Sequence, residues 1–487
     1  MNRNLYTIFS LATGMSLLLL LTVFGESGGF LLASLLTGSL ALLFLIQYKR
    51  PVLGLAIILL GIGPWYWGID IGKLPKVFVD EMLLLLYTVY FFLSYAALRQ
   101  KRLFTGDKLT VMSLIIMLCT QSVSFLYNET NYDAVRNYLE TYVFGILLYF
   151  IFLNETDEKN LGFIVNAIVL TTVLLSIAML VEWALNYNPV MERAEDMLYL
   201  SPQLSRITGN VYRPYATFFH PSESGTFLAM GLPFVYYKAA ASRKLWSWEA
   251  LLVALVLAAI VINYTRGVWL AVWLCAFIYI RQLRRPLLYF TLPAIILGVL
   301  IASVFQDAPF ARRLFDPTNI IARIFYWDIA LDIFKQHPLI GVGHMNFKNV
   351  YLDFVRNISS GVEFDIRRVV VPDSLYLSTL VESGLLGLGS LLAFWSIAIT
   401  KLRRADVQLK VQLRGPYGDL AACCIQGISI YILAGLLADV HQFTKATKLA
   451  FILLGFGFSM MGSAFPNLAG SDKTASPPRG SQAGDQT

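Results

Sequence analysis

Five arginines stand close to the ends of long apolar runs, where a side chain can meet a phosphate group at a membrane surface. A guanidinium group is a planar fork of N–H donors that fits phosphate oxygens and stays charged at any accessible pH. The alternative is that each arginine reaches toward the membrane interface or pairs with a nearby carboxylate. For an average member of the set this alternative is favoured; for Arg266, on a turn with almost no other polar residue, phosphate binding is favoured. The five are Arg136, Arg206, Arg213, Arg266 and Arg323.

A carboxylate, Asp373, follows a proline and precedes a long apolar run in the stretch VVVPDSLYLS. One interpretation is a helix N-cap, in which the side chain accepts a backbone N–H. The other is a general base at the boundary of lipid and water, and both can hold together. Glu382 lies about two and a half helical turns further along. It could face the same cavity or hydrogen-bond a neighbouring helix.

Three histidines could support such a site or be structural. His220 lies in FFHPSESG, His344 lies in GVGHMNF, and His337 precedes a proline, where it suits the C-terminal end of a helix. No pair of histidines has the spacing of metal ligands, and there is no CxxC motif. The sequence therefore predicts no metal site and no disulfide. The cysteines, which all lie inside apolar runs, are Cys119, Cys275, Cys423 and Cys424.

The composition is that of a membrane protein. Hydrophobic residues make up 57% of the 487 residues and charged residues 14%, against about 25% charged in a soluble domain. The net charge of +7 does not indicate nucleic-acid binding. The basic residues stand in short clusters between apolar runs, where membrane topology explains them.

The elements that would position these side chains are membrane-spanning helices, each needing about 20 apolar residues. Hydropathy predicts an all-α integral membrane protein with about 12–14 such helices. The first run is interpreted as a retained span, since no small-x-small cleavage site follows it. The predicted runs are 6–25, 29–47, 52–70, 80–98, 109–127, 137–153, 161–182, 223–241, 248–264, 267–281, 286–305, 375–400, 417–438 and 446–465.

Every second loop between these runs is basic, which predicts that those loops and both termini are cytoplasmic. Basic clusters flank the stretch 248–281 on both sides, so it must return to the face it left. We therefore expect a helical hairpin there, with its tip at Asn263–Gly267 on the outer face. The basic positions include Arg3, Lys49, Arg50, Arg99, Lys101, Arg102, Lys108, Lys159, Lys238, Arg243, Lys244, Arg281, Arg284, Arg285, Lys401, Arg403, Arg404, Lys410 and Arg414.

The predicted organisation is eleven spans in 1–305, one large extracytoplasmic loop in 306–374, three more spans in 375–465 and a disordered cytoplasmic tail in 466–487. A second outer loop covers about 183–222. Within the large loop, IARIFYWDIALDIFKQHP predicts an amphipathic helix. Its expected apolar face consists of Ile324, Trp327, Leu331 and Phe334.

Four stretches, in this order, resemble motifs of the O-antigen ligase and polymerase superfamily of bacterial envelope glycosyltransferases. YRPYATFFHPSESGTFLAMGLP resembles the family's stretch before a mid-chain span, and NYTRGVWLA its Ser/Thr-Arg-Gly-x-Trp hairpin tip. ARIFYWDIALDIFKQHPLIGVGHMNF resembles its Arg-x-x-x-Trp helix with Pro-Leu-x-Gly-x-Gly. PDSLYLSTLVESGLLGL is similar to its closing motif. The resemblance covers roughly residues 200–400.

The resemblance implies a GT-C-like, metal-independent, inverting glycosyltransferase of the bacterial inner membrane that needs no cofactor. The donor would be a glycan on a polyprenyl diphosphate such as undecaprenyl diphosphate. The acceptor would be a lipid A core sugar of lipopolysaccharide, another lipid-linked glycan or a protein hydroxyl. Asp373 and Arg266 would be catalytic, with His220, His344 and Glu382 as supporting residues. The residues expected to hold the diphosphate are Arg136, Arg213, Arg266 and Arg323.

One position departs from the family pattern. The closing motif usually begins with a histidine, and here Asp373 stands in its place. A carboxylate can accept a proton but is a weaker base than an imidazole. The departure leaves open a subfamily with another acceptor, or a member that no longer catalyses. The main alternative of another class is a polytopic transporter of a small anion such as inorganic carbon. Charges gathered at the outer boundary, with nearly clean spans, favour the enzyme.

Overall fold

The protein is described here by a computed structural model that covers fifteen separate stretches of the chain. These are residues 53–63, 68–69, 77–78, 81, 84–85, 87–90, 107–127, 132–189, 206–207, 211–241, 248–279, 318–358, 372–413, 416–438 and 444–464. Within these residues the fold is helical, with two antiparallel pairs of two-residue strands. The elements are β1 (Gly68–Ile69), β2 (Val77–Phe78), α4 (Lys108–Tyr127), α5 (Tyr132–Tyr138), the π-helix η2 (Leu139–Val143), α6 (Phe144–Glu155), α7 (Glu158–Leu185), β3 (Arg206–Ile207), β4 (Val211–Tyr212), α9 (Pro221–Ala241), α10 (Trp248–Ile262), α11 (Arg266–Ile278), α14 (Thr318–Gln336), α15 (Phe347–Ile358), α16 (Leu375–Leu413), α17 (Pro416–Ala434) and α18 (Thr444–Ala464).

The hydropathy runs that fall on described residues coincide with helices, with one exception. The run 52–70 was expected to be one span, but its helix covers only Leu53–Ile62 and is followed by β1. β1 pairs with β2 and so turns the chain back on itself. The predicted runs 6–25, 29–47 and 286–305, and the predicted tail 466–487, lie outside the described residues. The predicted division into domains stays a prediction.

Two of the described helices are long and apolar enough to cross a membrane, Asn160–Leu185 and Leu375–Val407. Five shorter apolar helices accompany them: Leu53–Ile62, Lys108–Ser124, Trp248–Ile262, Arg266–Ile278 and Asp419–Ala434. This set agrees with a multi-pass membrane protein, while the count of 12–14 spans stays a prediction.

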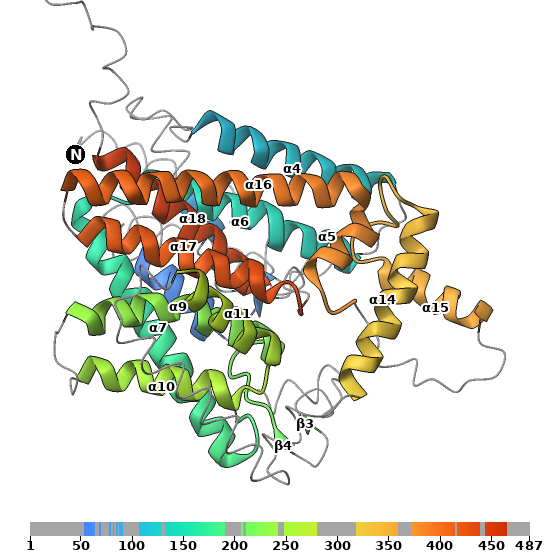
Figure 1. Ribbon diagram of the computed structural model, residues 1–487, viewed down its shortest axis with the longest axis horizontal. Coiled ribbons are helices and arrows are strands. Elements are labelled where there is room, and N and C mark those ends of the chain that lie inside the picture. Colours follow the sequence, from blue (N-terminus) through green and yellow to red (C-terminus); the bar gives the residue numbers. More distant parts are fainter. Residues whose placement is uncertain are drawn as a thin grey trace, which may run out of the picture.

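The long helices form a bundle in which α16 packs between α4 and α17 (Figure 1). α18 packs between α6 and α17, and α9 packs against α17, α10 and α7. Glycines allow the closest approach: a Cβ at Gly455 of α18 would stand 2.4 Å from the Tyr149 carbonyl oxygen of α6. Small residues at helix contacts are how membrane helices gain packing contact.

α14 and α15, from the predicted outer loop, lie beyond one end of this bundle, and α14 crosses that end (Figure 1). The predicted helix 321–338 is confirmed as α14, but of its predicted apolar face only Phe334 packs against the buried cluster of this region. Ile324 and Leu331 are exposed, whereas the buried residues are Ile329, Ala330 and Ile333. The pattern of apolar residues could not distinguish the two faces, because α14 has apolar residues on both.

Candidate active site

The loop that carries Arg213 is fixed by one buried carboxylate, Glu182 in α7. The Tyr212 hydroxyl donates to Glu182 Oε1 at 2.6 Å, and the backbone N–H groups of Tyr215 and Ala216 donate to the same carboxylate at 3.1 and 2.6 Å. Burial, and then the charge of Glu182, raise the pKa of the Tyr212 phenol, which stays protonated as a donor. These bonds on both sides of Arg213 hold it in place.

The predicted hairpin tip fastens onto the same loop. Asn263 Nδ2 donates to the carbonyl oxygens of Pro214 at 3.0 Å and Pro221 at 2.8 Å. The hairpin itself is closed by Trp269, whose indole N–H donates to the Ile260 carbonyl at 2.8 Å. Buried polar groups need such partners. Asn263 and Trp269 of the stretch NYTRGVW therefore have structural roles.

Two of the predicted arginines meet at this tip. Arg213 Nη2 donates to Thr265 Oγ1 at 3.0 Å. The next residue, Arg266, is the first residue of α11 and is half-buried. The structure therefore places Arg213 beside the turn that carries Arg266, while their role in holding a diphosphate stays a prediction.

The third arginine, Arg323 of α14, forms an ion pair with Asp373. Its Nε lies 3.2 Å from Asp373 Oδ2, and the side chains are 26% and 45% exposed. Trp327, one turn further along α14, donates its indole N–H to the Pro372 carbonyl at 2.8 Å. Among the described residues, the Nη groups of Arg323 have no hydrogen-bond partner. They are available to a further anion.

Asp373 itself is not the N-cap of α16. That place belongs to Ser374, whose carbonyl accepts the first helical bond from the Ser378 N–H at 2.8 Å. Asp373 has a left-handed backbone with φ +52°, a conformation that aspartate tolerates better than most residues. Its carboxylate is directed to Arg323 instead of to the helix backbone.

His220 links the loop that carries Arg213 to Arg323 of α14 by electrostatics. Burial, and after it the charges of Arg213 and Arg323, lower the pKa of this imidazole to about 3. Both guanidinium groups therefore lie within electrostatic reach of one imidazole. Its Nδ1 accepts the backbone N–H of Ser222 at 3.1 Å, which leaves the proton of the neutral ring on Nε2. The charge of Arg323 on α14 thus acts on the same loop that carries Arg213 and His220.

Three other predicted residues, Arg136, His344 and Glu382, belong to a second cluster of polar side chains. Arg136 pairs with Glu140 one turn along, with Nε 2.6 Å from Oε1. His344 Nε2 lies 2.9 Å from Asn137 Oδ1, and its Nδ1 lies 3.6 Å from Glu382 Oε2. Burial lowers the pKa of His344 to about 4. The contacts of the described residues link His344 and Glu382 to this second cluster.

The Pro-Leu-x-Gly-x-Gly stretch and the Glu-x-Gly stretch form one structure. α16 is interrupted at Gly384, and the loop Pro338–Gly343 lies against the interruption. Four backbone N–H to carbonyl bonds join them: Val342 to Val381 (2.9 Å), Gly343 to Glu382 (2.9 Å), Leu385 to Pro338 (2.9 Å) and Leu386 to Leu339 (3.3 Å). This contact aligns the start of α16, and with it Asp373, against α14.

Glycine is required at two places in this contact. Gly384 has φ +67°, and a Cβ there would stand 2.2 Å from the Leu339 carbonyl oxygen. Gly341 has φ +78°, and a Cβ there would stand 2.4 Å from the Glu382 carbonyl carbon. Only a residue without a side chain fits either position.

Two lysines of α18 are buried, and the sequence did not single them out. Lys445 Nζ donates to the Thr217 carbonyl at 3.3 Å and lies 4.7 Å from the centre of the Phe218 ring, while its backbone N–H donates to Glu223 Oε1 at 3.1 Å. It thereby supports the same loop that carries Arg213. A basic residue near the outer end of an apolar run was the available signal.

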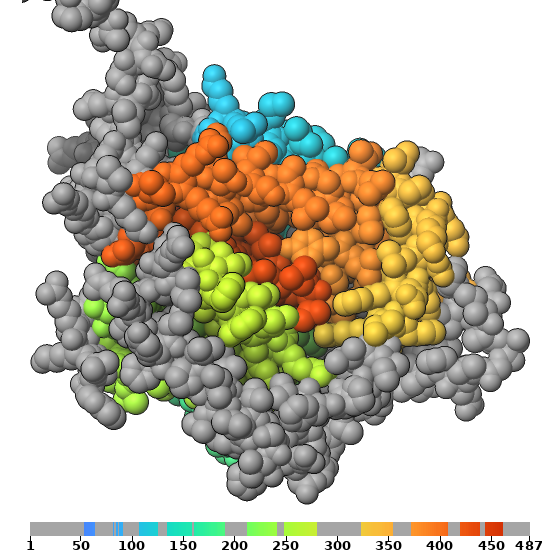
Figure 2. Space-filling view, in the orientation of Figure 1, coloured from blue at the N-terminus to red at the C-terminus, as the bar shows by residue number. Residues whose placement is uncertain are grey.

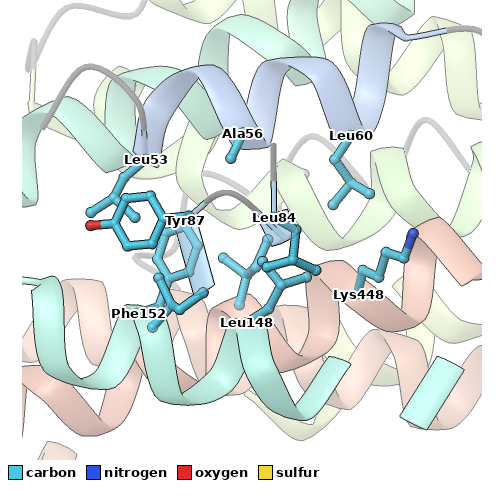
Figure 3. Close-up of a pocket in the computed structure, with 10 residues that line it drawn as sticks. Leu53, Ala56, Leu60, Leu84, Tyr87, Leu148, Phe152 and Lys448 are labelled. Carbon is cyan, nitrogen blue, oxygen red and sulfur yellow. The ribbon is translucent and has the colours of Figure 1, made fainter. Parts of the chain in front are cut away.

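The second lysine lines a small apolar cavity. Lys448 Nζ lies 3.2 Å from Glu81 Oε1, and both side chains are almost fully buried. Figure 3 shows Lys448 at one end of the cavity and Tyr87 beside Leu53 at the other, with Leu84 and Leu148 between them. None of the predicted site residues lines it, so it is separate from the candidate active site.

Residues 250–392, under a third of the chain, match a family model described as O-antigen ligase. This match supports the resemblance of the chain to the O-antigen ligase and polymerase superfamily. The ligase match includes Arg266, Arg323 and Asp373, whereas Arg213 and His220 lie before it. The search of curated proteins found no match.

The superfamily consists of glycosyltransferase-like ligases and polymerases of the bacterial inner membrane. Its members in general use polyprenyl-linked glycan donors and glycan acceptors. The match thus supports an enzyme of this type, located in a membrane. It gives no support to the transporter alternative.

Proposed function

We propose that the protein transfers or polymerises a glycan from a polyprenyl diphosphate onto an acceptor hydroxyl at the extracytoplasmic face of the inner membrane. Two contacts carry the proposal: Arg213 bonds to Thr265 beside Arg266, and Arg323 pairs with Asp373. The pKa of His220, which the charges of Arg213 and Arg323 both lower, supports their proximity. These residues come from four separate stretches of the sequence. Such a convergence of cations, a neutral imidazole and one carboxylate suits a diphosphate ester with a reacting hydroxyl beside it.

The arginines would hold the diphosphate. Arg323 offers its Nη groups while Nε stays with Asp373, and Arg266 stands at the N-terminal end of α11, where the helix dipole favours an anion. Negative charge grows on the diphosphate as it leaves, so fixed cations lower the energy of the transition state more than that of the bound donor. No metal ion is needed for this role. Arg136 would contribute at longer range.

Asp373 would take the acceptor proton. The acceptor oxygen forms a bond to the anomeric carbon while the bond from that carbon to the diphosphate oxygen breaks. The hydroxyl proton passes to the Asp373 carboxylate, and the electron pair leaves with the diphosphate. A direct displacement of this kind inverts the anomeric configuration. The ion pair with Arg323 keeps the carboxylate next to the leaving group, where this transfer is required.

The proposal is tested by genetic complementation with a matched surface control. The gene is deleted in its host and restored as wild type, Arg266→Ala, Asp373→Asn or Lys335→Ala, and surface glycans are separated on a gel. Lys335 lies on α14 like Arg323 but pairs with Asp332 in solvent. We expect wild type and Lys335→Ala to restore the glycans and the other two variants to fail at normal membrane levels.

The pattern of the change would identify the acceptor. A lost ladder indicates ligation to lipid A core, single-unit caps indicate polymerisation, and an unglycosylated protein indicates protein transfer. Unchanged glycans in the deletion strain would overturn the proposal. Full restoration by Asp373→Asn would remove Asp373 from the chemistry and leave the arginines as the remaining candidates.

A further inference from the structure

The loop Pro338–Gly343 exposes apolar side chains at the point where it meets α16. Leu339 is 61% exposed, and Leu385 and Leu386, directly after the interruption in α16, are each 52% exposed. The backbone bonds described above keep these three residues side by side. A soluble surface seldom gathers large apolar side chains in this way, so the patch requires a partner.

The length of α16 fixes how deep this patch lies. The cytoplasmic end of the span is marked by Lys401, Arg403 and Arg404. A hydrocarbon layer about 30 Å thick corresponds to about 20 helical residues, and 20 residues counted back from Lys401 end near Val381. Leu385 and Leu386 therefore lie inside the hydrocarbon layer on the outer side, and Leu339, bonded to Leu386, lies at the same depth.

A neighbouring helix that starts at the level of Lys401 gives the same depth. α4 has 20 residues and runs alongside α16 from the ion pair of Asp107 with Lys401. Near its other end, Ser124 Oγ donates to the Glu382 carbonyl. α4 thus spans the layer between the same two levels. The side chain next to that contact, Val123, is 47% exposed, as expected for a residue facing lipid at this depth.

The backbone of the loop satisfies the condition for non-helical structure at membrane depth. Lipid offers no hydrogen bonds, so irregular backbone is tolerated there only where protein satisfies it. The interruption at Gly384 would leave the N–H groups of Leu385 and Leu386 without helical partners. The carbonyl groups of Pro338 and Leu339 accept them, and in the opposite direction α16 carbonyls accept the loop N–H groups.

We propose that the loop Pro338–Gly343 is embedded in the outer leaflet of the bilayer, with Leu339, Leu385 and Leu386 in contact with lipid acyl chains. The patch continues along lipid-facing side chains of the same helices, such as Leu392 of α16 and Ile116 of α4. Figure 2 shows α4, α16 and α14 together on one face of the molecule. The loop thereby anchors α14 to the membrane. This inference is independent of the proposed reaction.

The first test uses unmodified protein, so that no variant has to fold. The full-length chain is reconstituted into vesicles of phosphatidylcholine that carry a diazirine on an acyl chain and contain no polyprenyl lipid. After irradiation, trypsin releases the peptide 336–348, which lies between Lys335 and Lys348 and contains Leu339. We expect lipid adducts on this peptide and none on the adjacent α15 peptide 349–356. Absence of adducts on 336–348, when the α16 segment is labelled, would overturn the proposal.

The second test measures depth at single positions. Spin labels are placed on Leu339→Cys and, as a matched control, on Lys335→Cys. Lys335 lies four residues earlier, at the end of α14, and its side chain is 71% exposed. The background is Cys119→Ala, because the other three cysteines are buried. We expect the label at 339 to collide several-fold more with oxygen than with a water-soluble nickel chelate, and the label at 335 to show the reverse. Equal nickel access at both positions would show that the loop lies in water.

Discussion

The two sides of the candidate site are held by different kinds of contact. On the α9–α11 side, Arg213 lies in a loop fixed by the buried side chains of Glu182 and Asn263. On the α14–α16 side, backbone bonds join the two helices, but the Arg323 and Asp373 side chains are held only by a half-exposed ion pair. The loop on the first side is therefore fixed by buried side chains, whereas the two charged side chains of the second can adjust when a donor binds, since exposed pairs contribute little to stability.

The largest effect is expected from Glu182→Ala. The change leaves the Tyr212 hydroxyl and two backbone N–H groups buried without an acceptor. Removing the acceptor from a buried cluster of hydrogen-bond donors lowers the free energy of unfolding by about 3–5 kcal/mol. Thermal unfolding in detergent should show it, with Asp332→Ala on the surface of α14 as the control. A wild-type melting temperature for Glu182→Ala would show that the first side is not rigidly held.

Asp373→Asn should separate activity from stability on the second side. Loss of a general base lowers the transfer rate by about 100-fold or more, while the exposed pair it disturbs contributes only about 0–1 kcal/mol to folding. The rate is measured with purified protein and a synthetic polyprenyl-diphosphate glycan, and folding by thermal unfolding. A large drop in melting temperature would mean that Asp373 is structural.

His220 should make the first side sensitive to acid. Its folded pKa of about 3 lies below the unfolded value of about 6.5. The unfolded chain thus binds the proton more readily, and the stability that His220 contributes is complete above about pH 6.5 and is lost as the pH falls toward 3. Between pH 7.5 and 5.0 the loss is about 1–2 kcal/mol.

The control for this effect is His220→Asn, whose Oδ1 can replace Nδ1 as acceptor for the Ser222 N–H. We expect a smaller fall in melting temperature between these pH values than in the wild type. An identical fall in both proteins would assign the acid sensitivity to other groups.

The smallest effect on folding is expected from Arg323→Ala. Its ion pair is 26% and 45% exposed, so the unfolding free energy should change by less than about 1 kcal/mol. Arg213→Ala on the other side removes a bond to the buried Thr265 and should cost more. Unfolding curves of the two variants, measured side by side, compare the two sides directly. Equal losses of unfolding free energy would contradict the proposed difference between the sides.

The helices of the described residues were largely predictable, because apolar runs of about 20 residues indicate helices that lie in lipid. Which face of each helix is buried was not predictable. On α14 the sequence placed Ile324 and Leu331 on the apolar face of an amphipathic helix, and both are exposed. At a lipid boundary an exposed position and a buried one both take apolar side chains, so periodicity does not separate them.

The candidate site was predictable in its charges but not in its supports. Arg213, Arg266 and Arg323 could be found because a basic residue on the outer side runs against topology. Glu182 and Asn263 could not be assigned a role, since each bonds to backbone groups of a loop distant in sequence. The glycine motifs could be recognised, but nothing in the side chains indicated that their backbones bond to each other.

The interruption at Gly384 also affects how the protein is made. The carbonyl groups of Pro338 and Leu339 complete the backbone of α16, yet they belong to a segment that the ribosome produces earlier. In the predicted topology this segment has already crossed the membrane when α16 enters the translocon. The second half of α16 therefore begins with two backbone N–H groups, those of Leu385 and Leu386, that bond to the loop Pro338–Gly343. We expect that this loop must already be on the outer side for α16 to insert correctly.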